Sequence, residues 1–293
     1  MIEKKKISIC FFGITRDLDK TFPSIERNII YPATKYADVK VFCHFYDLKE
    51  IDNIRSQEKN KITNKNWYLF KAHKLVSEKP NDIFKNYSLD NIKKFGDDYN
   101  DHYKSIRNLI HQLFSLKKVY ELSKSNSADL TIFVRPDLYY WDSFEKNIRN
   151  LINISKDYIA IPNWQFHKGF NDRFAICTSE YASSIYSNRI KEIDNYLIHN
   201  KRPLNAECLL FYAVSKSKAK TLLLDIKASR VRANGKMVSE SFVMKKSDYI
   251  KIFITNQKNI VFIKILRFIN KFFVINKVFF RKSLSFVINH KSK

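Results

Sequence analysis

Glycine is scarce in this chain, with four residues among 293, where average usage would give about twenty. Neither G-x-G-x-x-G nor G-x-x-x-x-G-K-[ST] occurs, which excludes the usual glycine-rich phosphate loops. Histidine and cysteine do not occur at the spacing of zinc ligands. No apolar run reaches the roughly 18 residues that a membrane-spanning helix needs. With so few glycines, each one, such as Gly13, is a candidate for a special backbone position.

The four cysteines form no Cys-x-x-Cys pair, and each lies in an apolar stretch. This pattern predicts buried free thiols in a reducing compartment. The N-terminal apolar segment is too short for the hydrophobic region of a signal peptide, so we expect a cytoplasmic protein. The 24 phenylalanines and 16 tyrosines exclude a mainly disordered chain, because such chains lack the apolar surface that offsets chain entropy.

Positive charge is abundant and unevenly spread. The formal net charge is +24, and the last 49 residues hold 12 lysines and arginines but one acid, Asp248. Residues 258–289 carry basic side chains at helical intervals between apolar ones, which predicts a basic amphipathic helix. Such a helix can lie in a membrane interface, dock on the protein's own core, or contact nucleic acid. We favour an anionic membrane surface bound through residues 250–290, at the inner face of the cell membrane. We expect no nucleic-acid partner, because no zinc finger or RNA-recognition motif is present.

Short apolar runs alternate with polar loops and helical periodicity along most of the chain. The runs predict buried strands at residues 6–14, 38–46, 129–134, 158–161 and 174–177. Helical spacing predicts helices at 105–122, 179–189 and 206–215, and a further helix that opens at Pro23. Residues 48–104 are polar and predict short helices or a mobile loop. The order strand, loop, helix, strand is typical of an α/β domain with a mainly parallel central sheet flanked by helices.

Polar side chains follow the predicted strands directly. Thr15 and Arg16 follow the first, Asp47 the second, and Arg135 and Asp137 the third. In open α/β sheets, ligands bind at the carboxyl edge of the strands. A carboxylate there can hold a divalent cation that neutralises a diphosphate, and arginine suits phosphate oxygens. Alternatively, an aspartate at a strand end only caps a turn.

A polar loop between two apolar runs, IPNWQFHKGFNDRFAI, is a candidate pocket wall. Its aromatic residues, Trp164 among them, can offer flat faces to a sugar or a base. Its Asn-Asp-Arg segment, residues 171–173, can instead be a turn with an internal ion pair. Glu207 begins an apolar helix, where the helix dipole favours a carboxylate. Arg230 and Arg232 lie in a basic turn that can close over a phosphate or remain solvated.

Taken together, these segments resemble a known family. In chain order they are ICFFGITRDLDKTFPSIERNI, VFCHFYD, RNLIHQLFSLKKV, FVRPDLYYW, GFNDRFAI, NAECLLFYAV and RVR. As an ordered set they are similar to bacterial glycosyltransferases of the GT-A type that are associated with surface polysaccharides. The resemblance spans residues 6–235. It implies a hexosyltransferase that moves a sugar from a nucleotide-sugar donor to a glycan or lipid-linked acceptor. We place the GT-A-like domain at 1–245, and the charge pattern places the basic amphipathic tail at 246–293.

The resemblance also implies roles for individual residues. By the resemblance, Thr15 and Arg16 face the donor, and residues 171–173 and Glu207 line the donor or acceptor pocket. With the strand-end and loop candidates above, the expected donor-binding residues are Gly13, Thr15, Arg16, Asp47, Arg107, Arg135, Asp137, Arg173, Arg230 and Arg232, and the expected acceptor-binding residues are Trp164, His167 and Asn171. Arg135-Pro136-Asp137 takes the place of the D-x-D metal motif, with arginine instead of the first acid. We expect a divalent cation, Mn²⁺ or Mg²⁺, at Asp137. The alternative is that Arg135 supplies the positive charge and no metal is needed.

Sugar transfer sets two chemical requirements. The departing nucleoside diphosphate gains negative charge, so a cation or an arginine must stabilise it. The acceptor hydroxyl must lose a proton, so an inverting enzyme needs a base, for which Asp172 and Glu207 are the candidates. Two other functions remain open: a nucleic-acid-binding protein, and a catalytically inactive GT-A-like domain that serves as an interaction partner.

Overall fold

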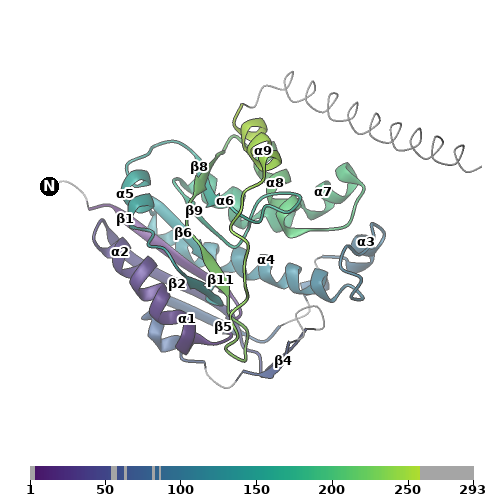
Figure 1. The fold of residues 1–293 in the computed structure, drawn as a ribbon, viewed down its shortest axis with the longest axis horizontal. Coiled ribbons are helices and arrows are strands. Elements are labelled where there is room, and N and C mark those ends of the chain that lie inside the picture. The colour runs from purple at the N-terminus through teal and green to yellow at the C-terminus, as the bar shows by residue number, and fades with distance from the viewer. Residues whose placement is uncertain (1–3, 54–57, 63–64, 81–82, 86, 258–293) are drawn as a thin grey trace, which may run out of the picture.

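A seven-stranded sheet forms the centre of the protein in a computed structural model, which describes residues 4–53, 58–62, 65–80, 83–85 and 87–257 (Figure 1). The strand order is β10-β8-β9-β6-β1-β2-β5. Their bounds are β1 (Lys6–Gly13), β2 (Asp38–Tyr46), β5 (Lys74–Glu78), β6 (Leu130–Val134), β8 (Tyr158–Pro162), β9 (Phe174–Cys177) and β10 (Lys220–Leu224). Four neighbouring pairs are parallel, and only β9 runs antiparallel to its neighbours β6 and β8. The predicted α/β class with a mainly parallel central sheet is confirmed.

Helices cover both faces of the sheet (Figure 1). On one face, α1 (Leu18–Ile25) continues through a π-helical turn, η1 (Glu26–Ile30), into α2 (Tyr31–Thr34), beside α5 (Glu145–Leu151). The opposite face carries α4 (Lys104–Ser123), α6 (Glu180–Ser187) and α8 (Ala206–Lys216). Alternation along β1 separates the two cores: Ile9 and Phe11 pack toward α1, whereas Cys10 and Phe12 pack toward α4, as successive side chains of a strand must.

Shorter elements complete the described part of the chain. Two small antiparallel sheets pair β3 (Glu50–Asn53) with β4 (Glu58–Lys61), and β7 (Leu138–Tyr140) with β11 (Ala228–Arg230). The remaining helices are α3 (Leu89–Lys93), α7 (Ile193–Asn200) and α9 (Lys246–Gln257). Single turns of 3₁₀ helix are η3 (Trp67–Phe70), η4 (Ile83–Lys85), η5 (Lys124–Asn126) and η6 (Arg189–Glu192). A third core joins α3, α4, α7 and α8 at one end of the molecule.

Two expectations about local structure need correction. The first helix does not open at Pro23: it begins at Leu18, because the side chain of Asp17 accepts the backbone N–H of Lys20 and so caps the preceding turn. The segment 48–104 is not only helix and loop, because it supplies β3, β4 and the parallel edge strand β5.

The chain after residue 245 begins with a helix docked on the domain. In α9, the side chain of Asn256 accepts from the backbone N–H of Thr221 at 2.8 Å and donates to the carbonyl of Thr221 at 2.9 Å, on β10. The amphipathic helix predicted at residues 258–289 lies outside the described residues. Among the described helices, none combines the length and hydrophobicity needed to cross a bilayer.

Candidate functional site

A cavity of about 960 Å³ lies at the carboxyl ends of β1, β2 and β6. Gly13 lines it at the end of β1 and Arg16 shortly after. Tyr46 lines it at the end of β2, and Arg135 directly after β6. The chain leaves β1 for β2 on one side and returns at β6 on the other. The strand order therefore reverses here, and ligands of open α/β sheets bind in the crevice at such a point. Gly13 has φ +100°, a left-handed conformation that favours glycine and lets the chain turn out of β1 into the cavity wall.

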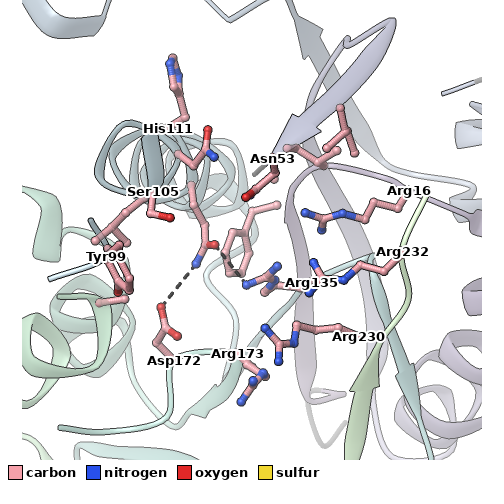
Figure 2. Close-up of a pocket in the computed structure, with 18 of the residues that line it drawn as sticks. Arg16, Asn53, Tyr99, Ser105, His111, Arg135, Asp172, Arg173, Arg230 and Arg232 are labelled. Carbon is pink, nitrogen blue, oxygen red and sulfur yellow. Dashed lines mark hydrogen bonds between the residues drawn. The ribbon is translucent and has the colours of Figure 1, made fainter. Parts of the chain in front are cut away.

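Five arginines converge on one side of this cavity, which we call the arginine end: Arg16, Arg135, Arg173, Arg230 and Arg232. They come from the loop after β1, the loop after β6, the residue before β9, and the end of β11. Figure 2 shows their guanidinium groups gathered on one side and directed toward the cavity. Because β9 is antiparallel to β6, the start of β9 meets the same edge of the sheet as the end of β6, which brings Arg173 into the group.

Buried carboxylates hold these arginines in place. Both oxygens of Asp137 accept from Arg135, at 2.9 Å from Nε and 2.8 Å from Nη2. Arg16 also bonds to Asp137 through Nη1, and its Nε lies 3.3 Å from Glu58. Asp137 and Glu58 are almost fully buried. Planar forks of this kind fix the direction of a guanidinium group as well as its charge.

Two more ion pairs order the remaining arginines. Glu240 accepts from Nε of Arg230 at 2.7 Å and lies 3.4 Å from Arg173. Glu58 lies 3.3 Å from Arg232. Five guanidinium groups therefore face three carboxylates in this cluster, which leaves two positive charges in excess.

The pKa values reflect this surplus of positive charge. Burial raises the pKa of Asp137, but the charges of Arg135 and Arg16 outweigh it and lower the pKa to about 2. Burial lowers the pKa of Arg173 to about 10; the Glu240 carboxylate opposes this shift, and neighbouring arginines add to it. An anion bound in the cavity would relieve the repulsion among these like charges.

The expected cation at Asp137 does not fit these contacts. A carboxylate offers about four lone-pair positions, and guanidinium groups of Arg135 and Arg16 already fill three of them. A divalent cation there would also lie against two positive charges. Within the described ranges, no cluster of three or more His, Cys, Asp or Glu side chains is arranged to hold a metal ion.

Asp172 is tied to both the arginine end and the protein interior. Gln112 on α4 accepts from Nη1 of Arg135 at 3.1 Å and donates to Asp172 at 3.4 Å, the bond drawn in Figure 2. On the other side, the fully buried Arg189 lies 3.3 Å from Asp172. Asp172 therefore lines the cavity while it also neutralises an arginine that has no access to solvent.

Glu207 lines the cavity from the first turn of α8, with a side chain 18% exposed and 3.8 Å from Nε2 of His167. The loop that carries His167 rests directly on this turn: Phe170 donates its backbone N–H to the Glu207 carbonyl at 2.9 Å. A Cβ at Gly169 would lie 2.0 Å from that carbonyl oxygen. Only glycine fits at this contact, which fixes the loop and helix relative to each other.

The side of the cavity opposite the arginines presents a group of neutral polar side chains, which we call the uncharged end: Tyr99, Ser105, Asn108, His111 and Asn205. Asp98 and Lys168 also line the cavity and pair with each other. Figure 2 shows Tyr99, Ser105 and His111 across the cavity from the arginines. Asn205 donates to the Tyr99 hydroxyl at 3.3 Å and caps α8 by accepting from Cys208. Burial, followed by the nearby Arg107 charge, lowers the pKa of His111, which keeps this side chain neutral near pH 7.

The structure brings most of the residues expected at the site together. Of the candidates named from the sequence, the cavity is lined by Gly13, Arg16, Arg135, His167, Asp172, Arg173, Glu207, Arg230 and Arg232. The other six, Thr15, Asp47, Arg107, Asp137, Trp164 and Asn171, are not among its lining residues.

Those six side chains are engaged elsewhere in the described structure. Thr15 accepts from the indole of Trp67, Asp47 pairs with Lys65, and Arg107 lies over the ring of Phe84. Trp164, Asn171 and Asp137 form the layer beneath the cavity. Trp164 is fully buried and donates to the Ile226 carbonyl, Asn171 donates to the Trp164 carbonyl, and Asp137 bonds to arginines.

No pattern in the sequence pointed to Glu58, Glu240 or Gln112. Glu58 lies in the polar segment that carries no periodic pattern, and Glu240 follows the last resembling motif. One general signal was available: arginines buried at strand ends need carboxylate partners, so acids had to converge on them. Which acids these are depends on the tertiary fold.

No protein-family model matches this chain, and no curated protein sequence matches it. Among solved structures, it is similar in part to the glycosyltransferase GlyE of Streptococcus pneumoniae TIGR4, in two structures at 12% and 13% identity, with TM-scores of 0.37 and 0.39. Both cover 75% of this chain, which spans less than half of GlyE, 46% and 45%. It is also similar to mouse xyloside xylosyltransferase 1 in its apo form, at 13% identity over 76% of this chain and 86% of that one, with a TM-score of 0.37.

Proposed function

We propose that this protein transfers a glycosyl group from a nucleotide-sugar donor whose diphosphate lies at the arginine end of the cavity. The observation that carries the proposal is the convergence of five arginines, two charges in excess of their carboxylates, at the carboxyl ends of adjacent parallel strands. The diphosphate of a nucleotide sugar bears two negative charges, so the two charge sets match. The motif resemblance along residues 6–235 supports sugar transfer as the reaction.

The arginine end suits the departing group. As the bond between the anomeric carbon and the diphosphate oxygen breaks, its electron pair leaves with the nucleoside diphosphate, and negative charge builds on that oxygen. Guanidinium groups that are fixed beforehand by Asp137, Glu58 and Glu240 stabilise this charge without reorganising. The same groups bind the intact donor, so only interactions that strengthen in the transition state accelerate the reaction.

We assign proton acceptance to Glu207. In a direct displacement, the acceptor oxygen bonds to the anomeric carbon and its proton passes to a base within hydrogen-bond reach. Asp172 and Glu207 both line the cavity, but Asp172 neutralises the buried Arg189. Glu207 is the more accessible carboxylate, and it lies two residues after Asn205 of the uncharged end.

The uncharged end supports an acceptor that is rich in hydroxyl groups. Tyr99, Ser105, Asn108 and Asn205 offer hydroxyl and amide groups that both donate and accept hydrogen bonds. Glycans and the sugar part of lipid-linked glycans present the same chemistry. We therefore propose a glycan or lipid-linked acceptor, as in the synthesis of bacterial surface polysaccharide, and a hexose as the transferred sugar.

Helix α9 supports the proposed contact with an anionic membrane surface. Tyr249, Ile250 and Phe253 are about half exposed on this helix, and basic residues, Lys246 among them, lie close by in the sequence. An apolar strip flanked by lysines matches the interface between lipid headgroups and acyl chains. Replacing these three side chains by serine should release the protein from vesicles that contain phosphatidylserine. Undiminished binding of that variant would contradict the contribution of α9.

A binding experiment tests the donor proposal. Calorimetric titration of the purified protein with UDP-, GDP- and ADP-linked hexoses should show saturable binding of at least one, and incubation should release the nucleoside diphosphate. Arg135→Gln should abolish most of the binding, whereas Arg149→Gln, at an exposed position on α5, should not change it. Absence of binding for every nucleotide sugar, or equal binding to the Arg135→Gln variant, would refute the proposal.

A further inference from the structure

Arginines paired with buried carboxylates supply the positive charge at the arginine end of the cavity. In the cluster at the arginine end, each of the three buried carboxylates contacts two arginines: Asp137 binds Arg135 and Arg16, Glu240 binds Arg230 and Arg173, and Glu58 binds Arg16 and Arg232. A divalent cation would therefore have to displace a guanidinium group from any of them. The carboxylates serve as counter-ions, and the arginines are the cations that face the cavity.

The arginines are also held rigidly. Arg135 makes a two-pronged contact with Asp137, a third bond to Gln112 at 3.1 Å, and accepts a bond on its carbonyl from the Tyr140 hydroxyl at 3.0 Å. Tyr140 is itself fully buried. A guanidinium group fixed by three hydrogen bonds, on a backbone held by a fourth, keeps its position when a ligand arrives, as a metal ion held by protein ligands does.

Donor capacity remains for a ligand. Asp137 uses Nε and Nη2 of Arg135 on one edge of the guanidinium, and each guanidinium carries five N–H groups. Together with the bond to Gln112, three N–H groups of Arg135 are engaged, which leaves two for a ligand. The arginine end thus combines fixed positive charge with unused donors, which is the requirement for binding phosphate oxygens.

From these contacts we infer that the site binds the diphosphate of its donor without a divalent cation, and that Asp137 is a positioning residue for Arg135 and Arg16 and does not ligate a metal. This inference rests on the proposed function for the identity of the ligand. It does not depend on sugar transfer itself, because binding of a diphosphate tests it directly.

The decisive measurement is calorimetric titration of the full chain with UDP, GDP, ADP and inorganic pyrophosphate, in excess EDTA and in excess MnCl₂. We expect binding of at least one of them in EDTA, with a Kd that MnCl₂ changes by less than about threefold. Binding that occurs only with MnCl₂, or that strengthens about tenfold or more, would overturn the inference but leave the proposed function standing. Binding in EDTA without transfer or hydrolysis of any nucleotide sugar would overturn the proposed function but leave the inference standing. No binding in either buffer would overturn both.

Substitutions at Asp137 test whether this residue acts as a counter-ion for the arginines or as a metal ligand. Asp137→Asn should weaken diphosphate binding in EDTA about tenfold, although it adds one positive charge, because Arg135 and Arg16 lose their fixed direction. Unchanged or tighter binding in EDTA would overturn the positioning role. Asp137→Glu, which keeps the charge, should recover part of the affinity.

A second variant covers the case in which Asp137→Asn does not fold. Arg232 is partly exposed, so Arg232→Gln should fold, and it should lose affinity about threefold to tenfold in EDTA with no recovery in MnCl₂. Recovery of binding in MnCl₂ would show that a cation can take the place of the arginine and would overturn the inference. Arg149→Gln on α5 is the matched control and should bind as the unchanged protein does.

Discussion

The two ends of the cavity are built on different principles. At the arginine end, charged side chains are held by buried ion pairs between segments far apart in the sequence, such as Arg232 and Glu58. At the uncharged end, neutral hydrogen bonds hold the side chains: Asn205 caps α8 and also donates to the Tyr99 hydroxyl. The first arrangement fits a ligand of fixed charge, and the second fits one recognised through hydroxyl groups.

The contrast also separates two tasks. Desolvated, preorganised charge is worth most where charge develops during a reaction, which suits the side that receives the leaving group. Neutral donors and acceptors bind without a net charge and let a polyol enter and leave. Gln112 links Arg135 to Asp172 by hydrogen bonds, and Glu207 lines the same cavity.

The largest expected effect is a loss of turnover when Glu207, the proposed proton acceptor, is replaced. Glu207→Gln should lower kcat by about 10²–10⁴-fold, because it removes the proton acceptor, and should leave donor Kd within about threefold. Steady-state assays of nucleoside diphosphate release, with donor titration alongside, measure both.

Asp172 provides the comparison for that experiment. Asp172→Asn leaves the fully buried Arg189 without its carboxylate, which should cost about 3–5 kcal/mol of unfolding free energy. Glu207→Gln should cost much less. If Asp172→Asn folds with normal stability and loses turnover while Glu207→Gln remains active, the assignment of the base is reversed.

The next largest effect is on nucleoside diphosphate affinity, which should depend on the arginine end and not on the uncharged end. Arg135→Gln should weaken nucleoside diphosphate binding by about tenfold to a hundredfold, because hydrogen bonds to charged groups contribute about 1.5–3 kcal/mol. Asn108→Ala, at the uncharged end, should change that Kd by less than about twofold and raise the KM for the acceptor instead. Equal losses of diphosphate affinity in both variants would remove the distinction between the two ends.

The contact between the loop that carries His167 and the start of α8 depends on one glycine, Gly169. Gly169→Ala places a Cβ against the Glu207 carbonyl, so the loop or the start of α8 must shift, at a cost of about 1–3 kcal/mol. Urea unfolding should show this loss. Gly235→Ala is the comparison, since its nearest contact is the flexible end of the Asp17 side chain, although its positive φ adds some strain of its own. A larger loss in Gly235→Ala would contradict the role given to the Gly169 contact.

The central sheet shows which strands can be predicted from sequence and which cannot. Strands β1, β2, β6, β8 and β9 match their predicted ranges to within one residue, because each is rich in apolar residues and largely buried. Strand β5 was missed: its sequence, KLVSE, is largely exposed at the sheet edge, and it forms a strand only by pairing with β2. Buried strands are specified by their own composition, whereas edge strands depend on a partner.

The sequence also predicted some site residues correctly and placed others in the wrong role. Arg16 and Arg135 were predicted because a polar residue directly after a buried strand must emerge at the sheet edge. Asp137 satisfied the same rule and yet lies beneath the cavity, since its arginine neighbours bind it there. Spacing places a residue near a site but does not decide whether it meets the ligand or supports a residue that does.

The last expected effect is a pH dependence confined to the arginine end. The pKa of Asp137 in the folded protein is about 2, where burial is outweighed by Arg135 and Arg16, and it is about 3.9 in an unfolded chain. Because the folded pKa is the lower one, the stabilisation is complete above about pH 4 and is lost as the pH falls toward about 2, by roughly 2 kcal/mol. Urea unfolding of the unchanged protein and of Asp137→Asn should therefore differ more near neutral pH than at the acid end of this range. Asn108→Ala, at the uncharged end, should show a difference that does not vary with pH. A constant difference for Asp137→Asn would mean that its carboxylate is not the counter-ion that holds the arginines.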